Sequence, residues 1–354
     1  FDREIEDVFA VQDEIAAAIA RKMKTTLAGG EASRAQRATD SIEAYEAYLK
    51  GRALLYRRGA FIKQGFALME EALRLDPEYG LAWAGIADAY SLQGDYGHIP
   101  PEVARTRGGE AAANAMRFAP ELAESHCALA MQLLMCEWDW IGAERAFKRS
   151  MELNPGYAQA GAWYHMFYQG FLCGAWDDAL AGVKAYHSRD QRSAYLTTLV
   201  AQVYGFGFSE PSAEVWVDRA VTLDPDAFYT LWARQLFLMS IHDGPRAIEA
   251  AHTALAASGR QMAPLLLLGL SLVEAGDTAG ARAVYDEIRS RAVREYVAPA
   301  ALATLEMALG DTDAASAPTP ALLEPFLTAP AWLIGDTGVA YHVAQTISAF
   351  TAMS

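Results

Sequence analysis

The chain has 354 residues, of which 53% are hydrophobic and 21% are charged, a composition typical of a globular protein with enough apolar material for a large core. Its formal net charge of -15 argues against broad nucleic-acid binding and against attraction to anionic membranes, because both surfaces are themselves negatively charged. No apolar run reaches membrane-spanning length and no signal peptide opens the sequence, so we expect a cytoplasmic protein.

Residues 1–30 predict an amphipathic helix. Apolar side chains recur there every four residues, at Ile15, Ile19, Met23 and Leu27. Gly29-Gly30 ends the pattern, and residues 31–39 are polar and indicate a linker. The sequence starts with Phe1 rather than Met, so we interpret this helix as the end of an upstream region.

Residues 40–315 carry a recurring pattern in which a helical run ends at an acidic or amide residue followed by proline. It occurs at Asp76-Pro77, Asn154-Pro155 and Asp224-Pro225, with a weaker copy at Ala119-Pro120. These prolines are 43, 35 and 70 residues apart in chain order, and 70 is two units of 35. Proline ends a helix because it lacks the N–H and clashes with the preceding turn. A period near 34 residues with two helices per unit is the signature of tetratricopeptide (TPR) repeats.

Other positions agree with this period. Small residues let two helices approach closely, and aromatic residues fill the space between them. Ala87 and Tyr90 fit such positions in a first helix, whereas Ala143 with Phe147 and Ala281 with Tyr285 fit them in second helices. The alternative is a generic helical bundle with chance prolines, which does not explain why several landmarks share one period. We therefore predict an all-α, TPR-like, right-handed superhelical solenoid with about seven helix pairs over residues 40–315.

Residues 316–354 predict a proline-rich segment followed by a C-terminal helix. From residue 295 to the end the chain has six acidic residues and no Lys or Arg. The last helix carries apolar residues at helical spacing: Val339, Val343, Ile347 and Phe350. It either caps the last repeat or packs on a second subunit or a missing domain, so a homodimer is one expected state.

Several stretches resemble the TPR region of one group of bacterial signalling proteins. They are Phe1-Asp2-Arg3-Glu4, the run Ala44 to Arg52, the run Trp83 to Tyr90, and Glu137-Trp138-Asp139-Trp140. In that group the array lies C-terminal to a class III adenylate cyclase, an OmpR-type winged helix or a protein kinase. The resemblance implies that such a domain lies upstream and that this chain has an interaction or regulatory role.

The concave face of a TPR array is lined by the first helix of each pair. The register places these residues there: Asp88, Met131, Met166, Tyr195, Gln202, Tyr229, Trp232 and Leu236. Lys and Arg are almost absent from these positions, which argues against a clamp for a peptide's terminal carboxylate. Met, Tyr and Trp suit an apolar helix or extended peptide, unless these residues are only core between repeats. If they bind, replacing Trp232 and Tyr195 by Ala abolishes capture and spares the fold.

The sequence offers no pattern for catalysis. It has no GxxxxGK[ST] phosphate loop, no GxGxxG after a strand and no zinc-type spacing of His and Cys, so we expect no cofactor, no metal and no enzyme activity of this chain. We predict a non-catalytic scaffold for a protein or peptide partner, with no nucleic acid and no membrane bound. The alternative is a sensory module that binds a small effector in its groove and regulates a tethered cyclase or transcription factor.

Overall fold

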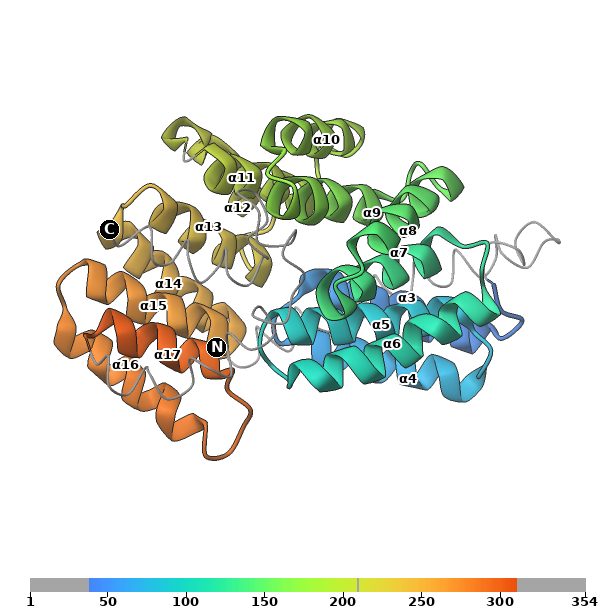
Figure 1. The fold of residues 1–354 in the computed structure, drawn as a ribbon, viewed down its shortest axis with the longest axis horizontal. Coiled ribbons are helices and arrows are strands. Elements are labelled where there is room, and N and C mark those ends of the chain that lie inside the picture. The colour runs from blue at the N-terminus through green and yellow to red at the C-terminus, as the bar shows by residue number, and fades with distance from the viewer. Residues whose placement is uncertain (1–37, 209, 311–354) are drawn as a thin grey trace, which may run out of the picture.

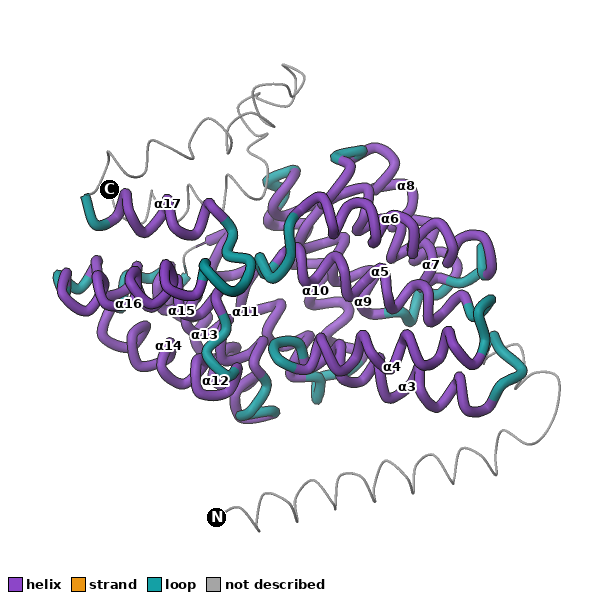
Figure 2. The backbone as a smooth tube through the Cα atoms, turned by 90° about the horizontal axis from the view of Figure 1, so that it is seen from below, coloured by secondary structure: helices purple, strands orange, loops and turns teal. Residues whose placement is uncertain are grey.

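The computed structural model describes residues 38–208 and 210–310, and every element assigned in these ranges is a helix (Figures 1 and 2). The helices alternate as first and second members of antiparallel pairs. The first helices are α3 (Ile42–Arg57), α5 (Gly80–Asp95), α7 (Ala123–Gln132), α9 (Ala158–Trp163), α11 (Ala194–Phe208), α13 (Phe228–Ser240) and α15 (Met262–Glu274). The second helices are α4 (Phe61–Leu75), α6 (Pro101–Phe118), α8 (Trp140–Leu153), α10 (Trp176–Arg189), α12 (Glu214–Leu223), α14 (Gly244–Ser258) and α16 (Thr278–Arg291).

Three short elements and one further helix complete the described chain. The π-helical turns η1 (Leu133–Glu137) and η2 (Tyr164–Leu172) continue α7 and α9, and a 3-10 turn, η3 (Pro211–Ala213), precedes α12. Helix α17 (Pro299–Ala308) follows the seventh pair. Helix α17 lies within residues 40–315, for which the sequence predicts the array of helix pairs.

The repeated acidic or amide residues end the second helices as the sequence predicts. Asp76, Asn154 and Asp224 are the residues after α4, α8 and α12, and each has an extended backbone instead of a helical one. The side chains of Asp76 and Asn154 also accept hydrogen bonds from the backbone N–H two residues on, at 3.1 and 3.0 Å. This Asx turn offers the backbone an alternative to another helical turn.

Close approach within the first pair explains a departure from the TPR pattern. Gly65 of α4 occupies a position where Ala is common, and a Cβ atom added there would lie 2.8 Å from the carbonyl oxygen of Gly51 in α3. The backbones of the two helices therefore touch directly. Between the first two pairs, the rings of Phe66 and Tyr90 meet edge to face at 5.2 Å.

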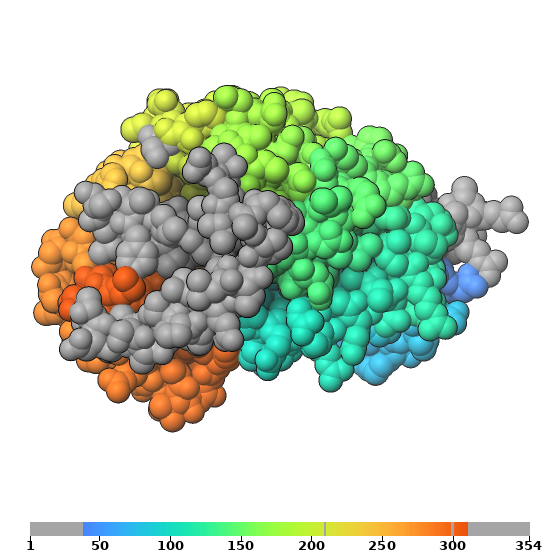
Figure 3. Space-filling view, viewed as in Figure 1, coloured from blue at the N-terminus to red at the C-terminus, as the bar shows by residue number. Residues whose placement is uncertain are grey.

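The stack of helix pairs curves so strongly that distant parts of the sequence meet. Helices α3–α6 and α13–α17 lie on opposite sides of the molecule, and α7–α12 arch between them (Figure 1). In the space-filling view the colours follow the same arc from cyan through green to orange (Figure 3). Tyr96, which follows α5, packs edge to face on Phe228 and Trp232 of α13, with ring centroids 6.1 and 5.6 Å apart.

The largest hydrophobic cluster extends from α3 to α13, and a second cluster joins the last helices from α14 to α17. None of the helices in the described ranges is both long and apolar enough to cross a membrane. The predicted N-terminal helix at 1–30 and the segment 316–354 lie outside the described residues. The division of the chain into these segments and the array therefore stays a prediction.

Candidate functional site: the inner pocket

The eight predicted groove residues all lie on first helices or on η2, which continues one. Six of them line a single pocket, here called the inner pocket: Met131, Met166, Tyr195, Gln202, Tyr229 and Trp232. Asp88 lines an adjoining second pocket, and Leu236 lines neither but packs, half-buried, against the large core cluster. The register thus brings together side chains that are separated by about a hundred residues, and their role in binding stays a prediction.

The inner face is less open than a groove. Trp232 is only 8% exposed and Met166 only 3%, and both belong to the large core cluster. The curvature that brings Tyr96 onto α13 narrows the inner face to a pocket at this level. Trp232 and Tyr195 line the inner pocket and also pack in or against the core cluster. Replacing either residue by Ala is therefore expected to lower the free energy of unfolding as well as any binding affinity.

The wall of the inner pocket is aromatic and fixed by its own contacts. The rings of Tyr195 and Tyr229 lie 5.3 Å apart, and the indole N–H of Trp163 donates to the hydroxyl of Tyr195 at 2.8 Å. Tyr229 in turn donates its hydroxyl to Oε1 of Gln202. Buried rings held by hydrogen bonds and edge contacts lose little further freedom when a ligand arrives, so the wall is preorganised.

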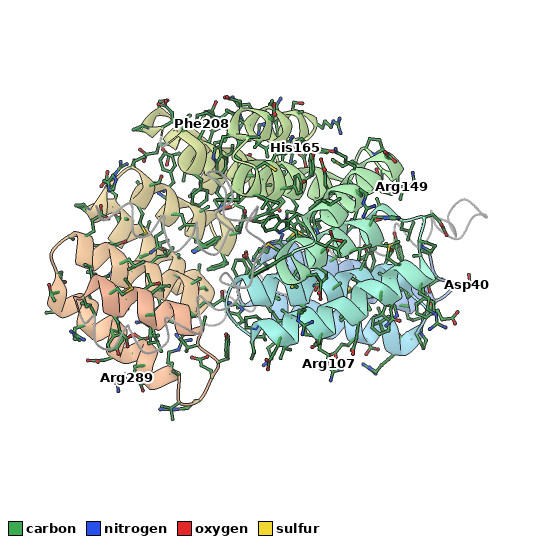
Figure 4. The ribbon with its side chains drawn as sticks, in the orientation of Figure 1. Asp40, Arg107, Arg149, His165, Phe208 and Arg289 are labelled. Atoms are coloured by element: carbon green, nitrogen blue, oxygen red, sulfur yellow. The ribbon has the colours of Figure 1, made fainter. Side chains whose placement is uncertain are left out.

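One cation, Arg58, reaches both pockets. It follows α3, is 3% exposed, and lines the inner pocket on one side and the second pocket on the other. Its Nη1 donates to the carbonyl of Leu55 at 3.0 Å, and its guanidinium lies 5.7 Å from the ring centroid of Trp163 and 5.4 Å from that of Tyr195. Other arginines, such as Arg107, Arg149 and Arg289, lie at the outer edge of the molecule (Figure 4).

The second pocket combines charges of both signs. It is lined by Arg52, Arg58, Asp88 and Glu124 together with tyrosines 48, 56 and 157. Oδ2 of Asp88 accepts from Nε2 of Gln159 at 2.9 Å, whereas its buried Oδ1 has no hydrogen-bond partner within residues 38–208 and 210–310. Burial raises the pKa of Asp88 to about 7, although the hydrogen bond from Gln159 and the charge of Arg58 act in the opposite direction.

The π-helical segment η2 shapes the inner pocket. It supplies Met166 and Phe167, and it follows directly on Trp163 of α9. A π-helical turn holds one more residue than an α-helical turn and so rotates the following side chains relative to the preceding ones. Such turns are uncommon and occur frequently at functional sites. No sequence pattern that we used predicts this segment.

The sequence did not identify several residues that line the pockets, among them Arg52, Arg58, Tyr96 and Trp163. Cations do reach the inner face, because Arg52 of the first helix α3 lines the second pocket and Arg58 enters from the turn after α3. A signal was present in the pair Arg58-Gly59, because a glycine after a helix marks a left-handed backbone. Among the residues described, no group of three or more His, Cys, Asp or Glu could hold a metal ion.

Comparison with known proteins defines the fold. No protein-family model and no curated protein sequence matches the chain. Among solved structures it is similar to the APC/C hetero-tetramer Cut9–Hcn1, with a TM-score of 0.56 and 14% identity over 78% of this chain and 52% of that chain. It is also similar to a human IFIT1 dimer with m7Gppp-AAAA, with a TM-score of 0.55 and 15% identity over 88% of this chain and 78% of that one.

Both neighbours are TPR-repeat proteins, and at these identities the likeness establishes the fold. The predicted all-α, TPR-like superhelical solenoid is therefore confirmed. The chain spans about half the length of the Cut9–Hcn1 chain that it matches.

Proposed function

We propose that this chain is a non-catalytic scaffold that binds a protein or peptide partner on the inner face of its superhelix. The observation that carries this proposal is the convergence of five consecutive first helices, α5 to α13, with Arg58 on one aromatic pocket. A polypeptide segment that crossed the inner face would contact several repeats at once. The concave faces of helical repeats suit an apolar helix or strand with a few anchoring side chains, and the inner pocket has room for one such anchor.

The neighbours in fold support this kind of partner. The Cut9–Hcn1 structure is of a protein complex, whereas the IFIT1 structure contains a capped RNA. For the present chain a protein is the better fit, since its net charge of -15 offers no broad surface to neutralise phosphates. We extend the proposal to the setting that the resemblance of residues 1–4, 44–52, 83–90 and 137–140 implies, namely the regulatory region of a bacterial signalling protein in the cytoplasm.

A small effector in the pocket is the second candidate function. The buried charges of Arg58 and Asp88 favour it, because polar groups fixed inside an apolar pocket are typical of sites that orient a ligand. Native mass spectrometry of the purified chain separates the two candidates. A retained molecule of constant mass that leaves on unfolding supports the effector, and its absence together with peptide binding supports the scaffold.

Site-directed photo-crosslinking tests the proposed binding face. The photoreactive residue p-benzoylphenylalanine replaces Phe206, which lines the inner pocket, or in a matched control Val215, which is 63% exposed on α12. Each chain is irradiated with a pool of biotinylated synthetic peptides of random sequence. We expect adducts from position 206 well above those from position 215. Equal labelling, or labelling from position 215 alone, would contradict an inner binding face.

A further inference from the structure

Arg58 is a buried cation that no carboxylate within residues 38–208 and 210–310 contacts directly, although Asp95 lines the inner pocket and Asp88 the second pocket. Its side chain is 3% exposed, and it forms no ion pair with any Asp or Glu of the described residues. Taking a charge out of water without pairing it is costly, and buried arginines normally meet a carboxylate or phosphate. The two nearby rings and the carbonyl of Leu55 offset part of this cost.

The backbone of Arg58 is strained as well. Its φ of 60° and ψ of -162° lie in a region that is populated almost only by glycine. A residue other than glycine costs about 1–3 kcal/mol there, and such strain concentrates at ligand clamps and active sites. The next residue, Gly59, also has a positive φ of 57°, and its Cα lies against the Phe228 ring of α13. The turn is thus held between the two ends of the arch, with its guanidinium directed inward.

Some hydrogen-bond donors that line the inner pocket have no acceptor among the described residues. A guanidinium carries five N–H groups; the carbonyl of Leu55 accepts from Nη1, and the hydroxyl of Tyr195 lies within hydrogen-bonding reach, so most of these N–H groups still have no acceptor in the part of the chain that the structure describes. The indole N–H of Trp232, which lines the same pocket and is buried, has no acceptor among the described residues. A ligand that brings two acceptor oxygens would satisfy donors that the protein itself leaves unmatched.

The size and charge of the pocket restrict that ligand. The pocket is partly open and its cavity volume is about 30 Å³, room for about two water molecules, so only the end group of a ligand enters and the rest lies along the inner face. A planar carboxylate matches this space and the fork of an arginine, whereas a phosphate has four oxygens to place. Asp95 lines the same pocket, so its negative charge weakens the attraction for any anion that enters.

We propose that the inner pocket is a carboxylate subsite, in which Arg58 and the indole of Trp232 hold an acidic group of the partner polypeptide between aromatic rings. The inference rests on the proposed scaffold function and names the chemistry of its partner. The acidic group comes either from the C-terminus of the partner or from an Asp or Glu side chain. The site differs from a clamp built on first helices, because its cation comes from the turn between α3 and α4.

Three libraries of fluorescent eight-residue synthetic peptides test the proposal with the full chain. The first has free C-termini and no Asp or Glu, the second has amidated C-termini and one central Glu, and the third has amidated C-termini and no acid. We expect tighter binding of the first or the second library than of the third, and the preferred library identifies the source of the carboxylate. The variant Arg58→Gln should bind the preferred library at least about tenfold more weakly and the third library unchanged.

Two further variants separate recognition from folding. Arg57→Gln removes the neighbouring cation, which lies 4.0 Å from the Phe61 ring centroid, and should bind as the parent chain does. Asp95→Asn removes the opposing charge and should tighten binding of the preferred library roughly threefold or more. If Arg58→Gln does not fold, Arg58→Gly removes the cation while relieving the backbone strain at φ 60°.

The outcomes distinguish this inference from the function on which it rests. Equal binding of all three libraries would overturn the carboxylate subsite and leave the scaffold function standing. Unchanged preference in Arg58→Gln or Arg58→Gly would likewise overturn it. Binding of no library would overturn both proposals.

Discussion

Asp88 makes the stability of this protein depend on pH in a direction opposite to that of most carboxylates. Its folded pKa is about 7 and its ordinary value is 3.8, because burial disfavours the charged form. Glu124, which also lines the second pocket, adds to the rise, whereas Gln159 and Arg58 oppose it. The folded chain therefore binds this proton more tightly than the unfolded chain does.

The magnitude follows from linkage. Below about pH 4 Asp88 is protonated in both states and has no effect, and from there to about pH 7 the free energy of unfolding falls as pH rises. At about 1.4 kcal/mol per pH unit, the gap between 3.8 and about 7 corresponds to a loss of up to about 4 kcal/mol at pH 8. Asp88→Asn removes the titration and keeps an acceptor for Nε2 of Gln159.

We therefore expect Asp88→Asn to match the parent chain near pH 4 and to exceed its stability by up to about 4 kcal/mol at pH 8. Urea unfolding followed by circular dichroism at five pH values between 4 and 8 measures this difference. Asp226→Asn, which changes an exposed carboxylate, is the matched control and should show no such trend. A difference that stays constant with pH, or a less stable Asp88→Asn at pH 8, would refute the reasoning.

Three further changes test the packing. Trp232→Ala should lower the free energy of unfolding, measured in urea, by about 3–5 kcal/mol, because the indole is buried where Tyr96, the residue after α5, packs on α13. A loss below about 1 kcal/mol would mean that the inner face is open. Gly161→Ala should lower the free energy of unfolding by about 1–3 kcal/mol, because the added Cβ would overlap the Tyr186 ring. Gly109→Ala has no atom near its added Cβ and should raise the free energy of unfolding by about 0.5–1 kcal/mol, and with it the melting temperature. Equal shifts of the melting temperature in the two variants would contradict this packing. Asp277→Ala removes the N-cap of α16 and should lower the free energy of unfolding by about 0.5–2 kcal/mol, as measured by thermal unfolding. An unchanged free energy of unfolding would mean that the first turn of α16 is frayed.

The sequence predicted those parts of the fold that local chemistry decides. Asp76 and Asn154 end their helices through side-chain hydrogen bonds to the following backbone. Asp190 does the same with the N–H of Arg192 at 3.2 Å, although Gln191 stands where the units ending at α4, α6, α8 and α12 have proline. The acidic or amide residue therefore suffices to end the helix here, and the proline reinforces it.

The candidate site was predicted only in part, because it depends on tertiary closure. The register identified the first-helix residues, whose positions follow from the repeat period. It could not place Arg58, whose inward direction is set by a strained backbone that only the packed turn maintains. Nor could it foresee that Tyr96 meets Phe228, since the curvature of the stack accumulates over many pairs and no local pattern encodes it.

Hydrogen-exchange mass spectrometry of the chain with its preferred peptide library tests most directly whether the inner face of the superhelix is the binding surface. We expect slower exchange on binding at residues 58–61, in η2 and in α13, with little change in the second helices α6, α8 and α12. Protection confined to those second helices, or protection at none of the inner segments despite saturating peptide, would contradict it.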